Sequence, residues 1–137
     1  MLPHLAYQQR QETTPPRIDV ILQLYDRMLA RLQLARAALE GGEAMTAGTA
    51  LGQVQMIVTA LASGLTADDE LSATHLRLYE FVAHQLAVPD AARIADAQRV
   101  LTTLRESFEA VRAEALRLER EGAIPSLDRA HTVCTTA

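Results

Sequence analysis

Two histidines with nearby carboxylates are the side chains in this sequence that could support chemistry. Glu70 precedes His75 by five residues, and Glu80 precedes His84 by four. A di-iron carboxylate site in a helical bundle needs Glu-x-x-His pairs that project inward. A zinc site needs His-Glu-x-x-His or paired cysteines. Neither pattern occurs in the sequence, so we expect these residues to lie on helix surfaces and predict no metal and no cofactor.

Phosphoryl transfer is the second chemistry to consider. One exposed histidine on a bundle helix can accept a phosphoryl group, and His75 and His84 are the candidates, with Arg77 as a cation close to His75. The lysine and the small glycine-bearing motif expected after such a histidine are missing. The sequence also has no glycine-rich phosphate loop and no nucleophile elbow. We therefore predict that the protein is not an enzyme, and keep histidine phosphotransfer as an alternative function.

A pattern of Leu-x-Leu-Tyr-acid occurs twice, as LQLYD at 22–26 and LRLYE at 76–80, in a chain with three tyrosines and no tryptophan. Neither tyrosine has a catalytic base or a phosphate loop beside it. Helical spacing places Tyr25 on the main apolar stripe of its segment. In the second segment the spacing places Leu78 in the core and Tyr79 beside it. The repeated pattern predicts two helices that each carry two apolar faces.

The composition narrows the classes of partner. The chain has 137 residues and a net charge of −4, and all thirteen basic residues are arginine. An acidic chain with mixed charges lacks the basic stripe that nucleic acid requires, and it lacks a polybasic membrane anchor. No stretch reaches the roughly 18 apolar residues of a membrane helix, and the N-terminus has no secretory signal pattern. With Cys134 as its single cysteine, the protein is predicted to be cytoplasmic, with no membrane insertion.

Apolar residues at spacings of three and four predict four helices of about 20–30 residues. The prolines of TPP at 14–16 mark the start of the first helix, and the glycine pair at 41–42 marks its end. Gly64, Pro89 and Gly122 end the other three, and Thr66 or Asp68 is available to cap the third. The predicted core stripes contain Ile18, Leu22, Tyr25, Leu29, Leu32 and Leu39; Leu51, Val54, Val58, Leu61 and Leu65; Leu71, Leu78, Val82 and Leu86; and Ile94, Ala97, Leu101, Leu104, Phe108, Val111, Ala115 and Leu118.

Short connections between these segments favour antiparallel neighbours. The predicted fold is therefore all-α, an antiparallel up-down-up-down four-helix bundle over residues 14–122. Residues 1–13 are expected to form an N-terminal arm, and residues 123–137 a loose, flexible C-terminal tail.

Three of the predicted helices carry more apolar surface than one core stripe requires. The additional residues are Ile21, Leu24 and Met28; Met56 and Ile57; and Leu76, Tyr79 and Phe81. Such a second stripe is explained by packing against two neighbouring helices. It is also explained by a groove that accepts an amphipathic helix from a partner. Periodicity does not choose between these two explanations, and a plain helical scaffold remains a third functional reading.

Several segments in order along the chain resemble the flagellar secretion chaperone family FliS. They are AYQQ at 6–9, TTPP at 13–16, LQLYD at 22–26, LARAALEGG at 34–42, LGQVQMIVTAL at 51–61, ELSATHLRLYEFV at 70–82 and LTTLRESFEAV at 101–111. The resemblance covers about residues 6–121. The chain departs from the family pattern at several positions, including Phe108, where tryptophan is frequent.

The resemblance implies an antiparallel helical bundle that binds the disordered C-terminal segment of flagellin in the cytosol. It also implies that the chaperone prevents premature polymerisation and passes its client to the export gate. The tyrosine of AYQQ is implied to shield the apolar surface until a client binds. We expect a monomer or weak homodimer. The predicted partner-binding residues are Tyr7, Ile21, Leu24, Tyr25, Ile57, Leu76 and Tyr79.

Overall fold

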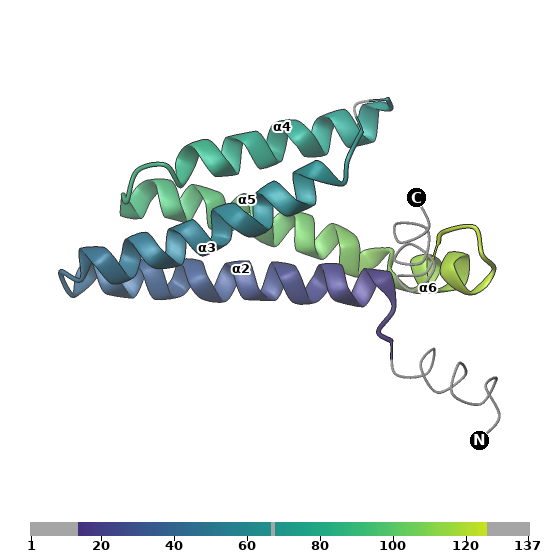
Figure 1. Cartoon of the computed structure of the whole chain (residues 1–137), viewed down its shortest axis with the longest axis horizontal. Helices are drawn as coiled ribbons and strands as arrows, with labels where there is room; N and C mark the ends of the chain where they lie inside the picture. Colours follow the sequence, from purple (N-terminus) through teal and green to yellow (C-terminus); the bar gives the residue numbers. More distant parts are fainter. Residues whose placement is uncertain (1–13, 67, 126–137) are drawn as a thin grey trace, which may run out of the picture. The chain divides into compact units, whose positions relative to one another are not determined.

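The computed structural model describes residues 14–66 and 68–125, and these residues form helices without any strand. The helices are α2 (Arg17–Glu40), α3 (Ala44–Ser63), α4 (Glu70–Gln85), α5 (Ala91–Ala110) and α6 (Arg112–Arg120) (Figure 1). The all-α prediction is therefore confirmed for this part of the chain.

The signals that begin and end α2 act as the sequence indicates. The carbonyl of Pro16 accepts hydrogen bonds from the backbone amides of Asp19 and Val20, at 3.0 and 3.1 Å. Proline fits this first turn because its missing N–H has no helical acceptor there. The helix ends at Glu40, and Gly42 follows with a φ of 73°. That left-handed conformation favours glycine, so the glycine pair ends the helix as predicted.

Asp69 caps α4, in place of the predicted Thr66 or Asp68. Its backbone is extended, with φ −126° and ψ 162°, and its carboxylate accepts a hydrogen bond of 2.7 Å from the amide of Ser72. An extended residue whose side chain reaches the amide three positions later is the standard arrangement at a helix N-terminus. The prediction was wrong by one residue because TADDE offers two consecutive aspartates.

The fourth predicted helix is divided in two. Helix α5 ends at Ala110, and α6 begins at Arg112 after Val111 leaves helical geometry with φ −102° and ψ 7°. The amide of Val111 donates to the carbonyl of Phe108, three residues back, at 3.2 Å. The prediction of one continuous helix from Ile94 to Leu118 is therefore wrong, although the apolar spacing continues through the break.

The chain divides into two compact units. Unit 1 is Met1–Gln23 with Ser107–Ala137, and unit 2 is Leu24–Glu106. The described part of unit 1 holds the start of α2 and all of α6. Arg112 binds Asp19 with both arms of its guanidinium, at 2.7 and 3.0 Å, and holds the pKa of the Asp19 carboxyl below its usual range. The Glu119 carboxylate accepts a bond of 3.0 Å from the Arg17 amide.

Polar contacts fix the direction of two helices within unit 2. Arg105 of α5 binds Asp26 of α2 at 2.6 Å, whereas Arg36, further along α2, binds Gln98, which is earlier on α5, at 2.9 Å. Because the partners run in opposite order, α2 and α5 are antiparallel in this unit. Helix α3 packs against α4 in the same unit.

The buried residues of unit 2 differ in part from the core residues that the sequence predicts. In α2 its buried residues are Tyr25, Met28, Leu32, Ala35 and Ala38, whereas Leu29 and Leu39 are only half-buried. The prediction that Met28 lies on a second stripe beside the core is therefore wrong. Alanines take some of the buried positions because small side chains allow neighbouring helices to pack closely, and Leu29 and Leu39 are left partly exposed. The other helices bury Ala47, Ala50, Leu51, Val54 and Val58; Tyr79, Val82 and Leu86; and Ile94, Ala97, Leu101 and Leu104.

Candidate binding surface

The two tyrosines of the repeated pattern meet inside unit 2. Tyr25 of α2 and Tyr79 of α4 are both buried, and their hydroxyl oxygens lie 2.7 Å apart in a hydrogen bond. Burial raises the pKa of each phenol. The prediction that Tyr79 lies beside the core is wrong, and Leu78 is the half-buried neighbour. Each copy of the pattern therefore supplies one hydroxyl to a bond between two helices.

The two histidines do not form a reactive cluster. His75 is half-exposed, and its Nδ1 lies 2.9 Å from the carbonyl oxygen of Leu71 in the preceding turn. Its ring also contacts Tyr79 edge-on, with ring centres 6.3 Å apart. His84 is exposed near the end of α4. Within residues 14–66 and 68–125, no group of three histidine, cysteine or acidic side chains is placed to hold a metal ion.

The predicted partner-binding residues separate into three groups. Tyr25 and Tyr79 are buried, so they are not part of the exposed surface. Tyr7 lies outside the described residues. The side chains that stay partly exposed are Ile21 in unit 1 and Leu24, Ile57 and Leu76 in unit 2.

Helix α3 has a surface that the sequence predicts only in part. Its 20 residues include no charged side chain, yet only five of them are buried. Met45 is 89% exposed and Met56 is 73% exposed. Among the described helices, α3 alone is long and apolar enough to cross a membrane, a property that core helices of soluble proteins share. The absence of charge over these 20 residues indicates the surface in the sequence, whereas apolar spacing does not include Met45.

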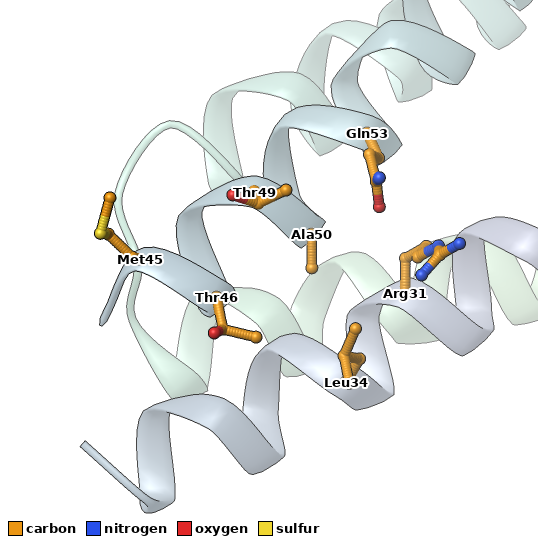
Figure 2. Close-up of a pocket in the computed structure, with 7 residues that line it drawn as sticks. All are labelled: Arg31, Leu34, Met45, Thr46, Thr49, Ala50 and Gln53. Atoms are coloured by element: carbon orange, nitrogen blue, oxygen red, sulfur yellow. The ribbon is translucent and has the colours of Figure 1, made fainter. Parts of the chain in front are cut away.

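A hollow of about 280 Å³ lies between α2 and α3 within unit 2. Leu34 points from α2 toward α3, while Thr46 and Ala50 point from α3 toward α2 (Figure 2). Arg31 supplies a cation at its edge, and Leu34 is 43% exposed there. The full lining is Arg31, Leu34, Met45, Thr46, Thr49, Ala50 and Gln53.

This lining is suited to holding a chain segment and carries no nucleophile with a base. Exposed methionines adapt their shape to a partner, and a hollow with a mixed apolar and polar lining gives a bound helix an orientation. The hydroxyls of Thr46 and Thr49 and the amide of Gln53 can pair with polar groups of a bound segment. These features are those of a helical protein with an exposed, uncharged helix face beside a shallow hollow.

The sequence matches the family described as flagellar protein FliS over residues 3–115. The match covers most of the chain, so the protein belongs to the FliS family, and its role is that of a non-catalytic flagellar chaperone. No curated protein sequence matches the chain. The family match ends within α6, a few residues after the break at Val111.

Proposed function

We propose that this protein is a cytosolic export chaperone that binds the disordered C-terminal segment of flagellin. By covering that segment, it prevents premature polymerisation and keeps the subunit ready for secretion. Membership of the FliS family supports a flagellar chaperone role. The observation that carries the proposal is the uncharged, largely exposed surface of α3 beside the hollow.

Physical reasons favour a disordered amphipathic client for this surface. Each square ångström of apolar surface removed from water contributes about 25 cal/mol, so covering Met45, Met56 and Leu34 is favourable. A disordered segment loses conformational freedom when it binds, and an apolar contact supplies the free energy to offset that loss. A partner that brought a charge against α3 would find no counter-charge on that helix, so an apolar contact face is favoured there.

The exposed predicted residues extend the proposed client contact. Leu24, Ile57 and Leu76 each keep part of the side chain accessible within unit 2. The buried Tyr25–Tyr79 bond joins α2 to α4, and we propose no client contact for either hydroxyl. Ile21 of unit 1 is the fourth accessible member of the predicted set.

The bundle and the N-terminal residues complete the proposed chaperone. Helices α2 to α5 are proposed to form an up-down-up-down four-helix bundle, and the antiparallel direction of α2 and α5 supports this. Residues 1–13 are proposed to act as an arm in which Tyr7 covers the apolar surface until a client binds. Delivery to the export gate completes the cycle.

Titration calorimetry with flagellin tests the proposal directly. Full-length flagellin should bind, and flagellin without its C-terminal segment should not. Met56→Glu should weaken binding at least tenfold because it places a charge in the apolar contact. Val88→Glu is the matched control, since Val88 is 46% exposed in the turn after α4. Equal binding to both flagellins, or binding to neither, contradicts the proposal.

A further inference from the structure

Two arginines of α2, Arg27 and Arg31, carry charges that the described part of the chain does not balance. They lie four residues apart and therefore share one face of the helix. Within residues 14–66 and 68–125, neither side chain has a hydrogen bond or an ion pair. The residues three and four positions from each are uncharged, apart from the other arginine. Like charges at this spacing repel each other, so the pair gives α2 no stability.

Several other arginines of the described chain do have carboxylate partners. The pairs are Arg99 with Asp96, Arg105 with Asp26, Arg112 with Asp19, and Arg117 with Glu114 and Glu121. The whole chain has 17 acidic and 13 basic residues, so it is not short of carboxylates. Arg27 and Arg31 are therefore available to an acidic group from outside the described chain.

Arg31 lies at the hollow between α2 and α3, together with neutral hydrogen-bond donors. It is half-buried, and it is the one charged residue among those that line the hollow. Gln53 points from α3 toward α2, and Thr46 and Thr49 add two hydroxyls (Figure 2). Within the described part of the chain, none of these three polar side chains has a hydrogen bond. A guanidinium beside neutral donors, with no acidic side chain in the lining, suits a carboxylate.

The two sides of the hollow differ in chemistry, and together they specify a partner. Helix α3 has no charged side chain, so it favours an apolar contact face. The two arginines of α2 favour carboxylates, and the four residues from one to the other span about 6 Å of helix. A helix meets both requirements when acidic side chains lie one turn apart along one edge of its apolar face.

We propose that these side chains form a carboxylate-binding edge that receives acidic side chains of the client helix. The members of this edge are Arg27, Arg31, Thr46, Thr49 and Gln53. The inference rests on the proposed function, because it names the chemistry of the same client. An apolar contact alone allows a helix to bind in either direction. Reversing the helix with its apolar face still on α3 would turn its acidic edge away from α2. The carboxylate-binding edge therefore fixes the direction of the client.

Titration calorimetry of the full chain with two forms of the flagellin C-terminal segment tests this edge. One form is native, and the other has asparagine and glutamine in place of its acidic residues. The wild type should bind the native form roughly tenfold more tightly, because the amide form loses charge-assisted hydrogen bonds. The double variant Arg27→Gln, Arg31→Gln should bind both forms equally. Raising the salt from about 0.1 M to about 1 M should weaken native binding more in the wild type than in this variant.

A second double variant controls for the change in net charge. Arg77→Gln with Arg120→Gln removes the same two charges from exposed arginines of α4 and α6 that do not line the hollow. It should keep the wild-type preference for the native segment. Urea unfolding controls for folding, and Arg27→Gln, Arg31→Gln should unfold at an equal or higher urea concentration than the wild type because a repulsive pair is removed.

The remaining outcomes separate this inference from the proposed function. Equal binding of both forms by the wild type overturns the carboxylate-binding edge alone, as does a wild-type preference that survives in Arg27→Gln, Arg31→Gln. Amidation of the segment's terminal carboxyl should leave its affinity unchanged. If that amidation weakens binding and replacement of the acidic side chains does not, the chain terminus is the ligand and the inference is wrong. A native segment that fails to bind the wild type contradicts the proposed function and the inference with it.

Discussion

Replacing Tyr25 by phenylalanine should destabilise unit 2 although the aromatic ring stays in place. The Tyr25 hydroxyl is the hydrogen-bond partner of the Tyr79 hydroxyl at 2.7 Å, and both residues are buried. In Tyr25→Phe the hydroxyl of Tyr79 loses this bond while it remains shielded from water. A buried polar group without its partner costs about 1–3 kcal/mol. We therefore expect Tyr25→Phe to lower the free energy of unfolding by about 2 kcal/mol.

The double variant separates the hydrogen bond from other effects of the substitution. Tyr25→Phe with Tyr79→Phe removes both hydroxyls and leaves an apolar contact between two rings. The loss in the double variant should be smaller than the sum of the two single losses, with a coupling of about 1 kcal/mol.

Urea unfolding followed by far-UV circular dichroism measures all four proteins of this cycle. Since the free energy falls by about 1–3 kcal/mol per molar urea, a loss of about 2 kcal/mol moves the midpoint by roughly 1 M. Equal slopes in all four proteins confirm that the comparison is of stabilities. Strictly additive single losses would show that the two hydroxyls do not interact, and would refute the hydrogen bond as the reason for the repeated pattern.

Two further predictions concern pH and helix capping. Burial raises the pKa of Tyr25 and Tyr79 in the folded chain, whereas an unfolded tyrosine titrates near 10. The folded state then keeps protons that the unfolded state releases, so urea midpoints should fall as pH rises above about 10, and less so in the double phenylalanine variant. Asp69→Ala should speed amide hydrogen exchange in the first turn of α4, because the Ser72 amide loses its acceptor, whereas Asp69→Asn should keep the exchange slow. Unchanged exchange in the alanine variant would contradict the capping role.

The sequence was sufficient for the elements that depend on local signals. Proline at the start of α2 and glycine at its end act within one turn, so their effect is readable from neighbouring residues. The same is true of the end of α3, which Gly64 marks, whereas α4 ends at Gln85, before the boundary predicted at Val88 and Pro89. Apolar spacing also identified the buried residues of α5 up to Leu104.

Features that depend on residues distant in the chain were harder to predict from the sequence. Leu78 and Tyr79 are adjacent and both apolar, so periodicity alone could not say which one faces the core. The choice depends on Tyr25, 54 residues earlier, whose hydroxyl Tyr79 binds. The break at Val111 has no glycine or proline to mark it. The residue at the break, Val111, is β-branched. The next residue, Arg112, pairs with Asp19, which lies 93 residues earlier in the chain.

The exposed residues of α3 show a different limit. A helix with apolar residues on several faces can bury any of them, and the residues left in water are those that no neighbour covers. Met45 and Met56 are in water because α2 and α4 pack elsewhere on α3, which its sequence alone does not state. Composition was the more useful signal there, since a helix without charge is unusual at a surface.

The tyrosine pair also provides an intrinsic spectroscopic probe of the α2–α4 contact. The chain has no tryptophan and three tyrosines, and two of them share one buried hydrogen bond. Tyrosine emission and near-ultraviolet circular dichroism can therefore be followed without tryptophan to mask them. In a Tyr7→Phe variant the signal comes from the pair alone. Loss of near-ultraviolet ellipticity with retained helix content would then detect loosening of the α2–α4 contact before global unfolding.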